Sequence, residues 1–269
     1  MTIAFQTAEN RADTSGTQCL QRSFAVMRFL AGGASEGEKL VDIAGALDLS
    51  HPTAHRILKA LESEGIVERP AGSRRYRLGA EAAWLGVAAY NRCPITRIAA
   101  ATLDRLVGQV GDSVFLAVPS HLDAVYADRR LGSYAVQAGR VGIGARRPLG
   151  GNVAGQTLLA FMSQQRVEQI LGDNDSRYRD WGFSADIVQR RAATARAQGY
   201  LCADSRINPE RRVLSVPVRD VVGRPIAAIS VLAARPRLGT ERVGRLVPLL
   251  AEAAREIGAA VQHRAQMAS

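Results

Sequence analysis

The sequence predicts an α+β protein with a small N-terminal domain and a larger domain in which helices flank an antiparallel sheet. Three observations support this class. Three short helical patterns and two short strand patterns lie between residues 17 and 79. Strand patterns alternate with helical ones after Pro94. An alanine-rich helical stretch lies between the two regions. We therefore expect a flexible tail at 1–16, a domain at 17–79, a linker helix at 80–94 and a second domain at 95–265.

Composition narrows the classes of function. The chain has 269 residues, enough for two domains, and 47% of them are hydrophobic. Lysine and arginine exceed aspartate and glutamate by 35 − 25 = +10, which favours anionic partners such as nucleic acid or an acidic ligand. The three cysteines and four histidines are scattered, so no metal site or disulfide framework is predicted. No secretory signal or membrane-spanning run is visible, and we expect a cytoplasmic protein that does not bind membranes.

The first helix is predicted from Leu20, with Leu20, Phe24, Met27 and Leu30 on its buried face. The stretch AGGASEG at 31–37 ends it, and a second helix follows at 40–47. Asp48 and Leu49 form a tight turn in which Asp48 adopts the left-handed conformation that usually calls for glycine.

A third helix begins after Ser50 and ends before Gly65. Ser50 is a good N-cap, Pro52 is tolerated in the first turn, and glycine is the usual residue just beyond a helix. Ala54, Ile57 and Leu58 recur at helical spacing, so they anchor the helix to the core. The next segment, IVERPAGSRRYRLG, is typical of two strands joined by a turn. Together these are the elements of a winged helix-turn-helix.

A helix in this position places its N-terminal residues against base edges in the major groove, and a basic hairpin follows the DNA backbone or minor groove. The alternative is a solvated basic face on a small helical domain. The order of elements and the basic hairpin favour DNA binding. The predicted DNA contacts are Ser50, His51, Thr53, Ala54, His55, Arg56, Lys59, Arg74, Arg75 and Tyr76.

The remainder of the chain mixes helices and strands. RPLGGNVAGQTLLAFM passes from a glycine-rich loop into a helix, and the final helix starts after Thr240 with an apolar stripe. The other predicted helices are 95–108, 164–172 and 184–198, and the predicted strands are 113–118, 124–130, 211–220 and 225–233.

These motifs resemble the IclR family of bacterial transcriptional regulators. SHPTAHRIL, followed by Leu-Glu-x-x-Gly and Tyr-Arg-Leu-Gly, is similar to the family's recognition helix and wing. RRPLGGNVAGQTLLAF resembles the segment that lines its ligand pocket, and VLSVPVRDVVGRPIAAISVLAARPRL resembles its strand-turn-strand signature. The resemblance covers nearly the whole chain. It implies that the second domain is a GAF-like effector-binding domain.

The glycine-rich loop independently suits a ligand, because glycines allow close backbone approach and a helix follows. The alternative is a tight turn packed on the sheet. Members that bind small oxo-acids carry a cysteine and two serines in the last strands, whereas the matching residues here include Val213 and Leu232. We therefore expect an aromatic or longer carboxylic acid. The predicted effector contacts are Leu149, Gly150, Gly151, Ala154, Gly155, Asp204, Val213, Ser215, Ser230 and Leu232. Arg129, Arg130 and Arg140 are further candidates for balancing an acid's charge, but a solvated surface arginine is the favoured interpretation of each.

The predicted function is a ligand-responsive transcriptional regulator that binds double-stranded operator DNA and a small carboxylic acid, with no cofactor, metal or catalytic residue. We expect it to act as a dimer or a dimer of dimers. The linker helix, with Trp84 and Tyr90, and the outer face of the second domain are the two candidate surfaces for self-association, and the alternative for Trp84 is packing within the chain. A sequence-indifferent nucleoid protein is one alternative, but it leaves the second domain unexplained. An enzyme is another, but residues 95–269 contain no nucleophile elbow, phosphate loop or zinc-protease motif, and only two histidines, His121 and His263.

Overall fold

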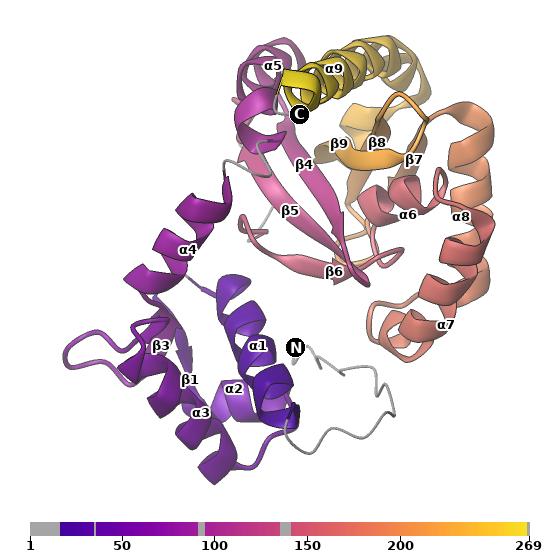
Figure 1. Cartoon of the computed structure of the whole chain (residues 1–269). Helices are drawn as coiled ribbons and strands as arrows, with labels where there is room; N and C mark the ends of the chain where they lie inside the picture. Colours follow the sequence, from indigo (N-terminus) through magenta and orange to yellow (C-terminus); the bar gives the residue numbers. More distant parts are fainter. Residues whose placement is uncertain (1–16, 35, 91–94, 135–140, 268–269) are drawn as a thin grey trace. The chain divides into compact units, whose positions relative to one another are not determined.

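The computed structural model describes residues 17–34, 36–90, 95–134 and 141–267 (Figure 1). The chain divides into two compact units, Met1–Cys93 and Pro94–Ser269. Two predicted segments lie outside the described residues: the tail, 1–16, and the last four residues of the linker helix, 91–94.

The first unit is a winged helix-turn-helix. Its sheet has the order β1-β3-β2, so a short strand before α2 joins the predicted hairpin. Sequence analysis did not identify this strand, which has only two residues and pairs antiparallel with β3. The elements are α1 Gln18–Ala31, β1 Glu38–Lys39, α2 Leu40–Ala46, α3 His51–Ser63, β2 Val67–Glu68, β3 Arg75–Leu78 and α4 Ala80–Tyr90.

The turn between α2 and α3 has the predicted conformation. Asp48 has a φ of 51°, in the left-handed region that a tight turn requires. The backbone amide of Leu49 donates to the carbonyl oxygen of Ala44 at 2.9 Å and closes the turn. Gly65, with a φ of 67°, follows the end of α3. Local sequence signals thus predicted both ends of α3 correctly.

The buried face of α1 differs from the prediction. Val26 and Leu30 are buried, whereas Leu20 and Phe24 are more than half exposed. Because α1 contacts α3 and β3, the residues that face these elements form the core. A periodic apolar pattern predicted the helix, but α1 carries apolar residues on two faces and the pattern did not identify the covered one.

The second unit holds a six-stranded sheet with the order β6-β5-β4-β9-β8-β7, in which all neighbours are antiparallel. Strands β6 and β7 are short and were not among the predicted strands. The elements are α5 Ile95–Val110, β4 Ser113–Ser120, β5 Asp123–Arg130, β6 Arg146–Pro148, α6 Val153–Leu159, α7 Gln164–Asp180, α8 Ala185–Gln198, β7 Leu201–Asp204, β8 Arg211–Arg219, β9 Pro225–Ala234, a 3-10 turn Arg235–Leu238 and α9 Thr240–Met267.

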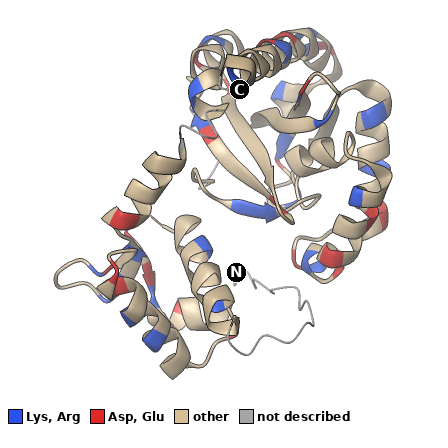
Figure 2. Ribbon diagram, in the orientation of Figure 1, with Lys and Arg blue, Asp and Glu red and all other residues tan. Residues whose placement is uncertain are grey.

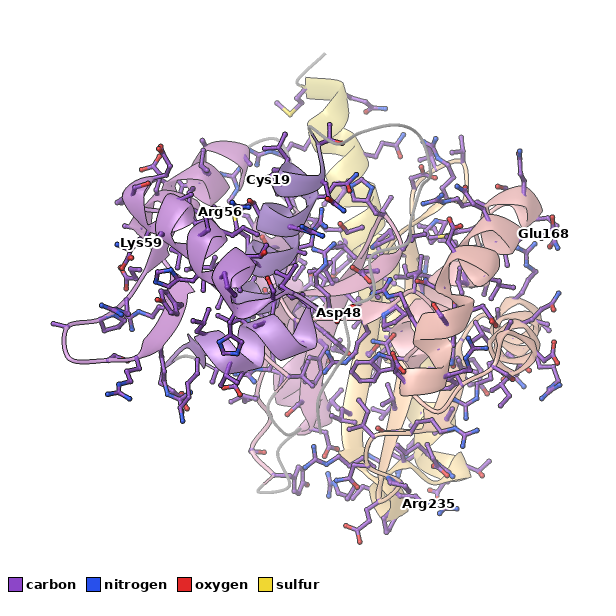
Figure 3. The ribbon with its side chains drawn as sticks, turned by 90° about the horizontal axis from the view of Figure 1, so that it is seen from below. Cys19, Asp48, Arg56, Lys59, Glu168 and Arg235 are labelled. Atoms are coloured by element: carbon purple, nitrogen blue, oxygen red, sulfur yellow. The ribbon has the colours of Figure 1, made fainter. Side chains whose placement is uncertain are left out.

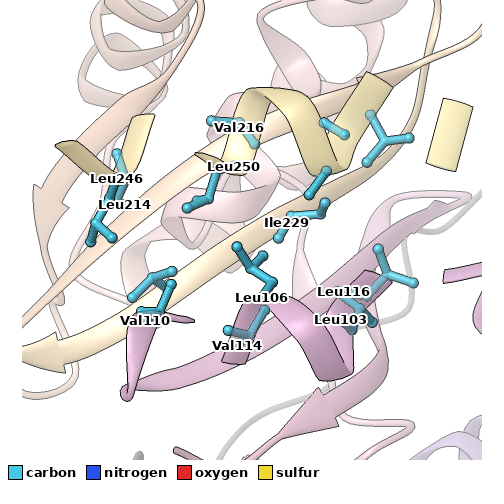
Figure 4. Packing of buried hydrophobic residues seen from close by; sticks show 14 of the residues in the cluster. Leu103, Leu106, Val110, Val114, Leu116, Leu214, Val216, Ile229, Leu246 and Leu250 are labelled. Carbon is cyan, nitrogen blue, oxygen red and sulfur yellow. The ribbon is translucent and has the colours of Figure 1, made fainter. Parts of the chain in front are cut away.

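Helices cover the two faces of this sheet differently. On one face α5 and α9 lie side by side and bury leucine, isoleucine and valine side chains against β4, β8 and β9 (Figures 1 and 4). On the other face α6 packs directly on the sheet, and α7 and α8 lie farther from the centre of the sheet than α6 does. Alternating strand residues therefore face two separate cores.

Helix α7 is longer than the predicted 164–172, because it continues to Asp180. The extension is polar, and its buried residues have hydrogen-bond partners in the rest of the unit. The Asn174 side chain donates to the carbonyl oxygen of Leu122 at 2.8 Å, and the Tyr178 hydroxyl donates to that of Leu149 at 2.6 Å. These tertiary bonds stabilise a helical segment that lacks an apolar period.

Candidate DNA-binding surface and ligand cavity

The first turn of α3 is built as its sequence predicts. The backbone amide of Thr53 donates to the Ser50 Oγ at 3.4 Å, and the two hydroxyl groups lie 2.8 Å apart. Ser50 has the extended backbone of an N-cap. The two hydroxyls thus already hold each other in place, which orients Thr53 before any partner binds.

The exposed side of α3 is basic. Arg56 and Lys59 are labelled on this helix in Figure 3, and its lysine and arginine positions are blue in Figure 2. His51, His55, Arg56 and Lys59 are exposed, and Thr53 is half-buried. Ala54 is 0% exposed and packs in the core, so its prediction as a DNA contact is wrong.

The wing comprises β2, β3 and their turn. Arg74 is exposed beside the turn, whereas the Arg75 guanidinium donates to the carbonyl oxygen of Gly37 at 2.9 Å and so helps to hold β1. Tyr76 is 5% exposed and belongs to the core, so its prediction as a DNA contact is also wrong. Arg69, just before the wing turn, is also exposed and was not among the predicted contacts; its guanidinium lies 6.0 Å from the centroid of the Tyr76 ring.

Helix α4 presents apolar side chains to the surface of its unit. Trp84, Leu85 and Val87 are 64%, 57% and 60% exposed. Large exposed apolar side chains gathered on one helix are typical of interaction surfaces.

A cavity of about 270 Å³ lies in the second unit, between the sheet and the segments around α6 and β7. Aromatic and aliphatic side chains form most of its wall, including Phe115, Phe183, Val141 and Val153. The Phe115 and Tyr126 rings meet edge to face, with centroids 5.5 Å apart. An apolar cavity with a few polar groups is the usual form of a small-molecule site.

Six of the ten predicted effector residues line this cavity: Gly151, Ala154, Asp204, Val213, Ser230 and Leu232. The register places Val213 opposite Leu232 and Ser215 opposite Ser230, so these side chains share the face that α6 covers.

The other four predicted residues are not part of the cavity wall. Leu149 is fully buried, and Gly150, with a φ of 106°, packs against Tyr178. Gly155 packs against Gly150, and Ser215 lies beneath the wall, where its Oγ accepts from Ser230 Oγ at 2.9 Å. None of these four residues lines the cavity, which corrects their prediction as direct contacts.

One end of the cavity has polar side chains from β5, β6 and the loop before α6. The Asn152 side chain donates to the Tyr126 hydroxyl at 2.9 Å and accepts from the backbone amide of Gly155 at 2.6 Å. Burial raises the pKa of Tyr126 above its ordinary value, so this phenol stays protonated at neutral pH. The Arg147 guanidinium stacks on the Trp181 ring at 4.3 Å from its centroid, and burial lowers its pKa.

Sequence analysis missed Arg147, Tyr126 and Asn152. Arg129 and Arg130, which the sequence suggested for balancing an acid's charge, do not line the cavity. Arg129 donates to the carbonyl oxygen of Val141 at 2.9 Å, and Arg130 pairs with Asp104 and Asp128. Arg140 lies outside the described residues.

The opposite end contains Asp204, Asn208 and Arg211. Two arginines neutralise the Asp204 carboxylate: Arg212 at 2.7 Å and Arg235 at 3.4 Å. The hydrogen bond from Arg212 lowers the pKa of Asp204 below its usual value. This carboxylate is therefore ionised and already paired.

Among the described residues, no group of three or more histidine, cysteine, aspartate or glutamate side chains is arranged to hold a metal ion. None of the described helices is both long and apolar enough to cross a membrane.

Two family models match most of the chain. Residues 19–71 match the IclR helix-turn-helix domain, and residues 87–259 match the bacterial transcriptional regulator IclR C-terminal domain. The glycerol operon regulatory protein of Streptomyces coelicolor is 31% identical over 91% of this chain and 94% of its own length. The transcriptional repressor AllR of Klebsiella pneumoniae is 27% identical over 91% of this chain and 90% of its own.

Solved structures share the fold. An IclR homologue from Microbacterium hydrocarbonoxydans, complexed with 4-hydroxybenzoate, has a TM-score of 0.69 and 22% identity, covering 91% of this chain and 100% of that one. An IclR regulator from Alicyclobacillus acidocaldarius has a TM-score of 0.71 and 22% identity, covering 90% and 98%. The relatives are named as regulators, in agreement with the prediction of a regulator and not an enzyme. This chain belongs to the IclR family of transcriptional regulators, with a helix-turn-helix domain and an effector-binding domain.

Proposed function

We propose that this regulator reads a two-half-site operator with α3 and the wing, and that a carboxylic acid with an apolar, preferably aromatic, body controls it from the cavity. The observation that carries the effector proposal is the cavity wall. Val213 and Leu232 make the strand side apolar, and Phe115 and Phe183 offer aromatic faces. The 4-hydroxybenzoate bound by the Microbacterium relative supports the same class of acid.

The proposed DNA contacts are the accessible members of the predicted set: Ser50, His51, Thr53, His55, Arg56, Lys59 and Arg74, with Arg75 holding the wing. Arg69 is added because it is exposed beside the wing turn. Arg56 and Lys59 supply phosphate contacts or base contacts, and Thr53 is oriented by Ser50.

Self-association is part of the proposal, because two half-sites require two recognition helices. Exposed Trp84, Leu85 and Val87 on α4 are the proposed contacts. Exposed Leu20 and Phe24 on α1 are further apolar surface in the same unit.

The test is fluorescence anisotropy on DNA from directly upstream of the protein's own gene, with scrambled DNA and a Thr53→Ala plus Arg56→Ala variant as controls. We expect tight binding to the upstream DNA alone, lost in the variant and shifted by 4-hydroxybenzoate or a related acid. Equal, steeply salt-dependent binding to both DNAs would favour a nucleoid protein. A thermal-shift screen in which only two- or three-carbon acids bind would exclude the aromatic class.

A further inference from the structure

The Arg147 guanidinium lines the ligand cavity but has no carboxylate partner among the described residues. The acids near the cavity are already engaged. Asp123 accepts from Arg146 at 2.9 Å and from Arg177 at 2.6 Å, and Asp204 is paired with two other arginines. A cation removed from water without a counter-ion is unfavourable, and an anionic ligand would offset that cost.

Neighbouring side chains hold this guanidinium in place. It stacks on Trp181, and one of its amino groups donates to the carbonyl oxygen of Arg146 at 2.7 Å. Its remaining N–H groups are available as donors. Strand alternation explains the orientation, since Arg146 and Arg147 are consecutive in β6 and therefore project to opposite faces of the sheet. Arg146 pairs with Asp123, which leaves Arg147 on the cavity side.

A second donor lies at the same end of the cavity. The Tyr126 hydroxyl accepts a hydrogen bond from Asn152, so its own proton points elsewhere, and none of the described residues accepts it. The phenol remains protonated because burial raises its pKa. The register of β5 and β6 pairs Arg147 with Ala124, so Tyr126, two residues further along β5, is a diagonal neighbour of Arg147 on the same face, and both line the cavity.

We propose that Arg147 and Tyr126 together bind the anionic group of the effector, with Asn152 positioning the Tyr126 hydroxyl. This inference rests on the proposed ligand cavity and states which end of the cavity binds the acid group. The acid group lies at the β5–β6 end, and the apolar body extends over Phe115 towards Leu232 and Val213. From β5 to β8 the sheet advances three strand spacings, about 14 Å at roughly 4.8 Å each, which leaves room for a ring beyond the acid group.

The test measures binding of benzoate and its neutral analogue benzamide to the full-length protein by calorimetry, without DNA. We expect benzoate to bind wild type at least about tenfold more tightly than benzamide, since charge-assisted hydrogen bonds discriminate by roughly that factor or more. Arg147→Met should lower benzoate affinity by about tenfold or more and leave benzamide almost unchanged. Tyr126→Phe, which keeps the ring contact with Phe115, should cost benzoate a smaller factor.

Arg211→Met is the matched control, because it removes one positive charge from the other end of the same cavity. It should reduce benzoate affinity far less than Arg147→Met. Thermal unfolding of each variant identifies any that fail to fold, and Tyr126→Phe then remains as the second test.

The proposal is overturned if benzamide binds as well as benzoate, if Arg147→Met and Arg211→Met behave alike, or if benzoate does not bind wild type at millimolar concentration. Benzoate binding that depends on Arg147 but leaves DNA affinity unchanged would support this assignment while contradicting the proposed regulation by aromatic acids. Failure of this assignment can thus be distinguished from failure of the proposed regulation.

Discussion

Gly155 lies in the first turn of α6, directly against the loop that forms part of the cavity wall. An ideal Cβ added there would lie 2.7 Å from the backbone nitrogen of Gly150 and 2.9 Å from Asn152 Oδ1. Both distances are shorter than real Cβ contacts, so Gly155→Ala must displace the loop or the helix. Gly172, in α7, is a matched control because its added Cβ would meet nothing within 4 Å.

The magnitudes follow from these contacts. Alanine gains up to about 1 kcal/mol over glycine in a helix, so Gly172→Ala should stabilise the domain by about 0.5–1 kcal/mol. At Gly155 the overlap costs about 1–3 kcal/mol. Disturbing the Asn152 cap, which accepts from the Gly155 amide at 2.6 Å, adds about 1 kcal/mol. We therefore expect Gly155→Ala to lower the free energy of unfolding by about 1–3 kcal/mol despite its better helix propensity.

Urea unfolding followed by tryptophan fluorescence measures the difference. The chain has two tryptophans, so a Trp84→Phe background leaves Trp181 as the reporter of the effector domain. Protein concentration is held constant, because association would change the apparent stability. If Gly155→Ala stabilises the domain as much as Gly172→Ala does, the packing of α6 against its loop is not what demands glycine, and the reasoning is refuted.

Three further outcomes are expected. Arg56→Ala should weaken operator binding and, because a phosphate contact would be lost, reduce the slope of log affinity against log salt concentration by about 1. Anisotropy at several salt concentrations measures both quantities, and an unchanged affinity would show that Arg56 is not part of the interface. Trp84→Ser should shift the distribution of sedimenting species towards smaller ones without altering the unfolding midpoint of a dilute sample. An unchanged distribution would show that this face of α4 does not carry self-association. Because the pKa of Asp204 is depressed in the fold, its ion pairs contribute stability above the unfolded pKa of about 3.9 and lose it as the pH falls through the folded value. Asp204→Asn should thus have a lower free energy of unfolding than wild type at pH 7, and this difference should disappear below about pH 4. Urea unfolding at a series of pH values measures it, and a difference that does not change with pH would contradict a stabilising role of the Asp204 charge.

Short-range patterns in the sequence predicted those features of the fold that depend on interactions between residues close together in the chain. Ser50 caps α3, Asp48 adopts the left-handed turn and Gly65 follows the helix, because caps and turns involve residues only a few positions apart. The alternating and helical periods likewise predicted the longer strands and the helices that flank them.

Tertiary structure decided which faces are covered and which side chains meet. Tyr76 looked accessible from its position on the wing, but packing against α1 and other elements of its unit buries it. Ala54 was predicted both as a core anchor and as a DNA contact, and its complete burial leaves only the first role. The sequence likewise could not tell which of the adjacent Arg146 and Arg147 faces the cavity. That choice depends on Asp123, 23 residues before Arg146, which engages Arg146 and leaves Arg147 to a ligand. A one-dimensional pattern determines periods and caps, whereas burial and pairing depend on contacts that form only when the chain folds.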